Sequence, residues 1–283
     1  MPELPEVETI VRRLRDGTEF HPPVSGQTIQ SVLVTWERII AQPDPELFQS
    51  ELKGKHIKSI SRRGKFLHFR LTEGHLIAHL RMSGDMRMEK RISIQGEIQP
   101  LQSYDRVVVN FTSPWRLVFV NVRKFGRMYY TMDPQSVFGE LGPEPLSDDF
   151  TPRILFKRLH QHQRQIKPLL LDQSFIAGLG NIYTDEALFR AKIHPIRKSN
   201  ALTYNEAETL HHAIQTVLEE GIVQFGASLD WVYRGGEFQN YFRVYGREGE
   251  ACPNCGTPIE KILVGQRGTH FCPKCQRIPT SLS

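Results

Sequence analysis

Four cysteines form the clearest chemical pattern in the chain. They occur as two Cys-Pro-x-Cys pairs, Cys252 with Cys255 and Cys272 with Cys275, and 16 residues separate the pairs. Two such turns brought together by a hairpin place four thiolates at the corners of a tetrahedron, which suits Zn²⁺. The alternative is two disulfides, which a cytoplasmic chain would not retain. We therefore expect one structural zinc ion, closed by its four ligands and without a catalytic role.

The first ten residues, MPELPEVETI, combine prolines and glutamates before any apolar run. Helical spacing then relates four apolar residues, Val7, Ile10, Val11 and Leu14. Pro5 suits the first helical position, and Glu6 and Glu8 complement the positive end of the helix dipole. The helix does not explain Pro2 or Glu3, which precede it.

Three short stretches place cations beside apolar residues at predicted strand ends. They are SRRGKFLHF with Lys65, HLRMSG with His79 and Met82, and NVRKFGRM with Arg123 and Phe125. Apolar tips beside cations are typical of side chains that wedge into a base stack. Ordinary core packing is the alternative for Met82 and Phe125.

Two stretches in the second half could bind anions. In GLGNIY, a glycine-rich turn leads into a helix for which Asn181 is a good N-cap, and helix N-termini bind anions. Arg277 follows the last cysteine by two residues, so the metal loop would hold it rigidly for a phosphate. For GLGNIY, the alternative is a packing corner between helices that binds no ligand. For Arg277, the alternative is a solvated surface arginine.

Composition is that of an ordinary globular protein, with 39% apolar and 24% charged residues. The net charge of +5 favours a polyanionic partner without proving one. No stretch is long and apolar enough to span a membrane, and the early glutamates are incompatible with a signal peptide. We expect a cytoplasmic protein.

The predicted helices and strands, which must position these residues, divide the chain into several domains. The fold class is α+β. Residues 1–133 predict a leading helix and an antiparallel β-sandwich or barrel, with strands at 29–34, 57–60, 66–71, 76–80, 107–111, 117–122 and 128–131. Residues 134–150, rich in Pro, Gly and Asp, predict a linker. A helical domain follows at 151–233, and the cysteine-bearing segment occupies 234–283. Residues 88–105 predict a long loop or insertion.

Taken together, these motifs resemble the bacterial formamidopyrimidine-DNA glycosylase family. The resemblance runs nearly end to end, through PELPEVE, RRGK, HLRMSG, VRKFG, KPLLLDQ, GLGNIY, YGREGE and the cysteine pairs. It implies an N-terminal β-sandwich, a helix–two-turn–helix domain and a zinc ribbon with four cysteine ligands. It also implies a DNA-repair enzyme that binds damaged duplex DNA as a monomer, in association with the nucleoid.

The resemblance assigns chemistry to the chain's first residues. Once Met1 is removed, the secondary amine of Pro2 would attack C1′ of the damaged nucleotide, expel an oxidised purine and leave a Schiff base. An α-amino group has a lower pKa than a lysine side chain, so a usable fraction is neutral. The strand would then be cut by β,δ-elimination. Glu3 would act as acid/base, Glu6 would support it, and Lys65 and Arg277 would complete the catalytic set.

The resemblance also implies DNA contacts. His79, Asn181 and Arg277 would contact phosphates around the lesion, and Lys167 would bind DNA near the lesion. Met82, Arg123 and Phe125 would fill the space left by the flipped base, with Arg123 bonding the orphaned cytosine. A lesion-capping loop should lie near residues 235–242.

Two alternatives remain open. An endonuclease VIII-type relative shares the fold and prefers oxidised pyrimidines, but it places its void-filling residues differently. A non-catalytic zinc protein that detects distorted DNA is the second, against which the set Pro2, Glu3 and Lys65 argues.

Overall fold

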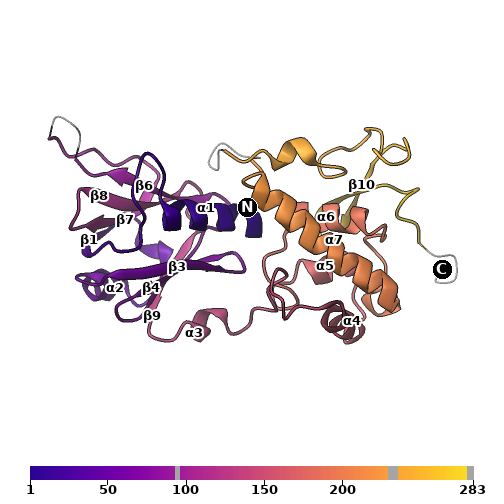
Figure 1. Ribbon diagram of the computed structural model, residues 1–283, viewed down its shortest axis with the longest axis horizontal. Coiled ribbons are helices and arrows are strands. Elements are labelled where there is room, and N and C mark those ends of the chain that lie inside the picture. Colours follow the sequence, from indigo (N-terminus) through magenta and orange to yellow (C-terminus); the bar gives the residue numbers. More distant parts are fainter. Residues whose placement is uncertain (93–95, 229–234, 279–283) are drawn as a thin grey trace. The chain divides into compact units, whose positions relative to one another are not determined.

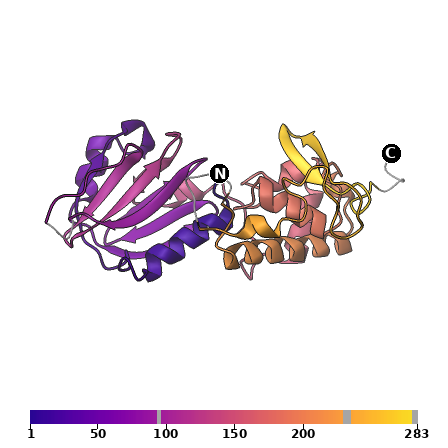
Figure 2. The ribbon, with the colours of Figure 1, turned by 90° about the horizontal axis from the view of Figure 1, so that it is seen from above.

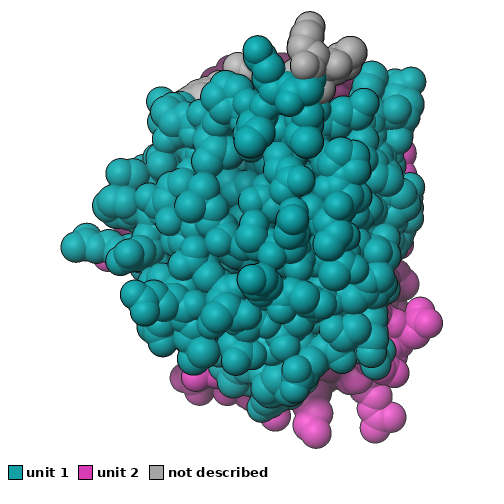
Figure 3. All heavy atoms as spheres, turned by 90° about the vertical axis from the view of Figure 1, so that its left-hand side faces the viewer, with its two compact units in different colours: residues 1–139, 228–236 teal, residues 140–227, 237–283 magenta. Residues whose placement is uncertain are grey.

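The computed structural model describes residues 1–92, 96–228 and 235–278. The chain divides into two compact units, coloured teal and magenta in Figure 3. The N-terminal unit comprises Met1–Gly139 with Ser228–Gly236, and the C-terminal unit comprises Glu140–Ala227 with Glu237–Ser283. The division at 139/140 falls inside the predicted linker.

The N-terminal unit is a sandwich of two sheets, as the sequence predicts. One sheet has the strand order β1-β7-β8-β6 and the other the order β2-β9-β5-β4-β3. Neighbours within the described strands pair antiparallel, apart from the parallel pair β2 and β9. The strand bounds are β1 Ile29–Val34, β2 Ile40–Gln42, β3 Ile57–Arg63, β4 Phe66–Leu71, β5 His75–His79, β6 Gly84–Lys90, β7 Asp105–Phe111, β8 Trp115–Asn121 and β9 Arg127–Thr131.

Two helices cover the edges of this sandwich (Figure 1). Helix α1, Leu4–Asp16, packs against β3 and β6, which are the edge strands on one side of the two sheets. Helix α2, Pro45–Leu52, packs against β1 and β2, the edge strands on the other side. Short helices η1, Glu37–Ile39, and α3, Gln135–Phe138, complete the unit. Covering exposed edges prevents their unpaired backbone groups from pairing with other chains.

The core explains why α1 has this position. Its four predicted apolar residues are all buried among side chains from both sheets. The opposite face of α1 carries Arg12 and Arg15, which are exposed. The helix therefore presents one apolar stripe to the sandwich, as its sequence period predicts.

Two strands, β6 and β2, were not predicted from the sequence. Strand β6 begins at Gly84 and ends at Lys90, so the predicted loop at 88–105 is wrong at its first residues. Met86 and Met88 alternate inward with charged residues along β6, as in a half-buried strand, but the strand propensity of the other residues in the segment is low. Strand β2 has only three residues, too few to show any period.

The C-terminal unit is helical with a small hairpin at its end (Figure 2). Its elements are α4 Pro152–His160, α5 Ile166–Leu170, α6 Asn181–Arg190, η2 Ser199–Ala201, α7 Tyr204–Val223, η3 Phe238–Tyr241, β10 Glu260–Val264 and β11 Arg267–Phe271. Helix α7 packs against α4 and α6 and starts with a capping box of Thr203 and Glu206. In the described residues, no helix has the length and apolar content needed to cross a membrane.

The zinc-ribbon segment belongs to the same compact unit as the helices. Strands β10 and β11 pair antiparallel, and β11 packs against α6. We expected separate domains at 151–233 and 234–283, whereas the described helices and the ribbon belong to one compact unit. The predicted boundary at 233/234 itself lies outside the described residues.

Candidate active site

The start of α1 gathers the first group of predicted site residues. Glu3 is the N-cap, and its backbone N–H donates to Oε2 of Glu6 at 2.7 Å in a capping box. The helix begins at Leu4, one residue earlier than expected, so Pro5 takes its second position. Pro2, Glu3 and Glu6 are all buried. The helix start therefore holds two carboxyl groups within a few residues of the Pro2 nitrogen.

The turn between β3 and β4 lies at the same end of the sandwich. Glu8 of α1 accepts from Nε of Arg62 at 3.2 Å, and Arg62 Nη1 donates to the carbonyl of Gly64 at 3.0 Å. These bonds tie the first turns of α1 to the turn that carries Lys65, whose side chain is buried. Gly64 has a φ of 54°, a conformation that glycine adopts readily, so the sharp RRGK turn needs it.

His79 is the last residue of β5. It pairs with Phe66, the first residue of β4, next to this turn. Its Nδ1 accepts the backbone N–H of Arg81 at 3.0 Å, which leaves Nε2 to carry the proton. Burial, and then the positive charges of Arg81 and Lys65, lower the pKa of His79 to about 3. His79 is therefore neutral at neutral pH, and its Nε2–H is a hydrogen-bond donor.

Met82, Arg123 and Phe125 occupy two neighbouring turns at this end. Met82 lies in the turn between β5 and β6, and the other two lie in the turn between β8 and β9. The strands that lead into these turns meet where Gly84 pairs with Asn121. Met82 is 40% and Phe125 51% exposed, which excludes the alternative that they are core residues.

Lys167 does not have the position that the sequence analysis expects. Its side chain is fully buried, and Nζ donates to Oδ1 of Asp185 at 2.6 Å and to the carbonyl of Gly268 at 3.0 Å. An ammonium group held in this way cannot reach a DNA phosphate without breaking a buried ion pair. We therefore correct the prediction of a direct DNA contact: Lys167 joins α5 to α6 and to the ribbon hairpin.

Asn181 and Arg277 also lie in the C-terminal unit. Gly180, and not Asn181, is the N-cap of α6, because the helix begins with Asn181 itself. Nδ2 of Asn181 donates to the carbonyl of Gly268 at 3.0 Å, so the amide lies against the ribbon hairpin. Arg277 is exposed, and its Nε donates to the carbonyl of Lys274 at 3.1 Å, which places the guanidinium on the second cysteine turn.

Three polar residues that the sequence analysis missed attach the ribbon segment to the helices. Asp185 accepts the His270 N–H at 2.9 Å in addition to Lys167, and Glu186 accepts the three N–H groups of residues 243–245 at 2.8–3.0 Å. Burial raises the pKa of Glu186, and these three donors oppose that shift. Gln276 donates to the carbonyl of Ile193 and accepts from the N–H of Cys272. In the sequence, the adjacent acidic residues Asp185 and Glu186 between apolar residues of α6 could have indicated two of these three contacts.

The four cysteines fit a zinc ion. All four are free thiols, and their sulfur atoms lie within 4.8 Å of one another. The Sγ–Sγ distances are 3.9 Å for Cys252 and Cys275 and 3.5 Å for Cys255 and Cys272. Sulfur atoms about 2.3 Å from a tetrahedral zinc ion would be separated by similar distances. The sequence prediction of one structural zinc site is confirmed.

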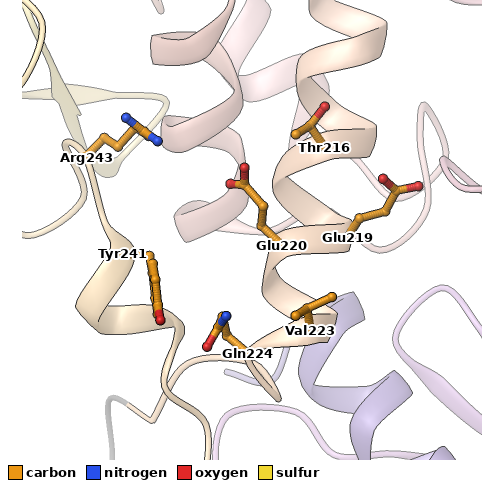
Figure 4. A pocket seen from close by; sticks show the side chains of 7 residues that line it. All are labelled: Thr216, Glu219, Glu220, Val223, Gln224, Tyr241 and Arg243. Atoms are coloured by element: carbon orange, nitrogen blue, oxygen red, sulfur yellow. The ribbon is translucent and has the colours of Figure 1, made fainter.

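A separate cavity lies along α7 and η3 (Figure 4). Its lining includes Glu219, Glu220, Tyr241 and Arg243. Glu220 is engaged by Nη2 of Arg190, at 2.6 and 2.8 Å from its two carboxylate oxygens. No predicted site residue lines this cavity, so it is not the candidate active site.

Comparison with known proteins agrees with this arrangement of fold and site. Residues 1–128 match the family model of the formamidopyrimidine-DNA glycosylase N-terminal domain, and residues 141–230 match its H2TH domain. Residues 249–278 match the zinc finger found in FPG and IleRS. The chain belongs to the formamidopyrimidine-DNA glycosylase family, and it is an oxidised-base DNA glycosylase that binds DNA.

Individual relatives extend over nearly the whole chain. A formamidopyrimidine-DNA glycosylase of Geobacillus kaustophilus is 44% identical, over 98% of this chain and 100% of that protein. One of Enterococcus faecalis is 42% identical, over 98% of both chains. The solved structure of Lactococcus lactis Fpg (MutM) with DNA containing N7-benzyl-Fapy-dG has a TM-score of 0.87 and 38% identity, over 98% of this chain and 100% of that chain. A structure of MutM with DNA containing carbocyclic 8-oxo-G has a TM-score of 0.86 and 39% identity, with 98% and 100% coverage.

Proposed function

We propose that this protein excises oxidised purines, chiefly 8-oxoguanine and formamidopyrimidines, and then cuts the strand at the resulting abasic site. The support is the chemistry of the α1 start together with the names of the relatives. MutM and Fpg structures contain 8-oxo-G or Fapy-dG in their DNA. The relatives' own names specify formamidopyrimidine and thereby favour purine lesions over the endonuclease VIII-type alternative.

Base excision needs a nucleophile and a proton donor beside one another. After removal of Met1, the lone pair of the Pro2 nitrogen attacks C1′, and the bond from C1′ to the base nitrogen breaks with its electron pair leaving on the base. The departing base takes up the proton of the Pro2 nitrogen, and Glu3 protonates the ring oxygen so that the sugar opens and an iminium ion forms. Glu6, which accepts the Glu3 N–H, keeps the backbone at this point in one position.

Strand cleavage follows from the charge of that iminium ion. A secondary amine gives an iminium nitrogen without a proton to lose, so the positive charge persists and acidifies C2′–H. Loss of this proton breaks the C3′–O bond and releases the 3′ phosphate, and a second elimination breaks the C5′–O bond. Water then hydrolyses the iminium ion and frees Pro2. Lys65, at the neighbouring turn, supplies positive charge for the phosphates.

The remaining predicted residues bind DNA in this proposal. The neutral Nε2–H of His79, the Asn181 amide and the Arg277 guanidinium are the donors to phosphates, with Arg277 completing the catalytic set by holding the kinked strand. Met82 and Phe125 enter the space left by the flipped base, and Arg123 bonds the opposite cytosine. Filling this space offsets part of an unstacking cost of about a few kcal/mol. We propose that the protein acts as a monomer at the nucleoid.

The single observation that supports the proposal is the capping box at the start of α1, which buries Glu3 and Glu6 in the first turn after Pro2. The test compares time courses on three duplexes, which carry 8-oxoguanine opposite cytosine, thymine glycol opposite adenine, or a preformed abasic site. We expect base release from the first duplex and cleavage of the third without added base or heat. Preferred release of thymine glycol would support the endonuclease VIII-type alternative. Tight binding without cleavage of any duplex would support the non-catalytic one.

A further inference from the structure

The two turns that carry Met82, Arg123 and Phe125 have an unusual backbone. Each contains one non-glycine residue in the left-handed region, Arg81 with a φ of 53° and Lys124 with a φ of 60°. Such residues cost free energy and persist only where the surroundings fix them. The structure therefore has to supply contacts that hold these turns, although their tips are exposed.

Asn121 supplies two of these contacts. Its side chain is fully buried between the turns, and Nδ2 donates to the carbonyl of Leu80 at 3.1 Å while Oδ1 accepts the N–H of Gly126 at 3.2 Å. One amide thus joins the start of one turn to the end of the other. A Cβ atom at Gly84 or Gly126 would lie 2.9 or 2.8 Å from this Nδ2, so both glycines make room for the bridge.

Ser83 supplies the second bridge. Its buried hydroxyl accepts the backbone N–H of Arg123 at 3.0 Å. The residue that would bond the opposite base is therefore fixed to the turn that carries Met82. Lys124 adds a third restraint, because its ammonium lies 3.9 Å from the centroid of the Trp36 ring.

We propose that Asn121 and Ser83 are positioning residues that set the register of the two turns and, through it, the preference for the base opposite the lesion. This inference rests on the proposed function, since it assigns a task to the void-filling residues. Neither side chain has to touch DNA, because both are buried beneath the turns. Their effect would pass through the backbone of Arg123, whose guanidinium lies 5.6 Å from the Phe125 ring centroid.

The test uses Ser83→Ala with Ser113→Ala as its matched control. Ser113 also loses one hydroxyl bond, to Oε1 of Gln27 at 2.6 Å, but it lies in the turn at the opposite end of β8. Binding is measured to duplexes that contain a tetrahydrofuran abasic analogue opposite cytosine or adenine. We expect the cytosine-to-adenine affinity ratio to fall about fivefold in Ser83→Ala, the factor for one lost hydrogen bond. The ratio should be unchanged in Ser113→Ala and restored in Ser83→Thr.

Two outcomes would overturn the inference. One is an unchanged ratio in Ser83→Ala at a melting temperature that shows the protein to be folded. The other is an equal loss in both variants, which would show a general stability effect. Because binding to the analogue requires no chemistry, this test is separate from the proposed reaction. A wild-type protein that binds the analogue but never releases 8-oxoguanine would contradict the proposed function while leaving this inference measurable.

Discussion

The N-terminal start of α1 and the middle of α6 each bury two acidic side chains, Glu3 and Glu6 in one case, Asp185 and Glu186 in the other. In α6, Asp185 pairs with Lys167 and the His270 N–H, and Glu186 accepts three backbone N–H groups. The bonds to residues 243–245 and 270 hold the ribbon segment on α6, and the pair with Lys167 joins α5 to α6. In α1, the acids lie at a helix start beside Pro2. Burial of a carboxyl group alone does not identify a catalytic residue; its partners and its place in the chain do.

The largest effect should follow a change at the α1 start. Glu3→Gln keeps the size of the side chain and removes its acid, so base excision should fall by about 10²–10⁴-fold, the usual contribution of general acid–base catalysis. Affinity for the abasic-analogue duplex should change little. Single-turnover release of 8-oxoguanine is the measurement, and Glu46→Gln, an exposed first-turn glutamate of α2, is the control. Normal excision by Glu3→Gln would make the α1 acids structural, like those of α6.

Loss of the buried ion pair at α6 should lower the stability of the protein. Lys167→Met leaves the buried Asp185 without its cation and should lower the unfolding free energy by about 3–5 kcal/mol. Lys261→Met is the matched control, since its pair with Glu248 is 3.4 Å long and exposed, and such pairs contribute about 0–1 kcal/mol. Urea unfolding of both variants checks the difference. Equal losses would mean that the buried pair stabilises the unit no more than a surface pair does.

A third change tests selectivity in the N-terminal unit. Arg123→Ala should reduce the preference for cytosine opposite the lesion by about 1–3 kcal/mol, the usual value for a base-edge contact. Stability should change little, because the Arg123 side chain is exposed. Excision rates opposite each of the four bases give the preference. If the ratios match those of the wild type, another residue reads the opposite base.

The smallest expected effect is on the pH dependence of stability. His68 bonds His75 at 2.8 Å between ring nitrogens, and burial, followed by the charge of His75, lowers the pKa of His68 from 6.5 to about 4. The unfolded chain therefore binds more protons than the folded one between these values, so stability falls as the pH drops through this window. His68→Gln should lose less stability between pH 7 and pH 5 than the wild type does. His212→Gln, at an exposed position, is the control. If His68→Gln lost as much stability between pH 7 and pH 5 as the wild type does, His68 would not be the group that titrates.

Local patterns in the sequence predicted much of this fold. Strands β1 and β4 match their predicted bounds, and the apolar stripe of α1 lies in the core, because residue period and burial are coupled along one element. The cysteine turns are equally local. Strand β6 was missed because Gly84, Asp85, Glu89 and Lys90 have low strand propensity, although its buried methionines alternate as in a strand.

Contacts between distant residues could not be predicted in this way. Asp185 meets His270 across 85 positions and Asn121 meets Leu80 across 41, and no sequence period encodes such pairings. The error at Lys167 has the same origin. The resemblance implied a DNA contact for this lysine, and only the fold reveals the aspartate that engages it.

The most direct test of the central claim is borohydride trapping. The protein is incubated with a duplex that contains one 8-oxoguanine opposite cytosine, reduced, digested and analysed by mass spectrometry. We expect a DNA adduct on the amine of Pro2, in a peptide that lacks Met1. An adduct on Lys65 or on another side chain, with Pro2 unmodified, would contradict it.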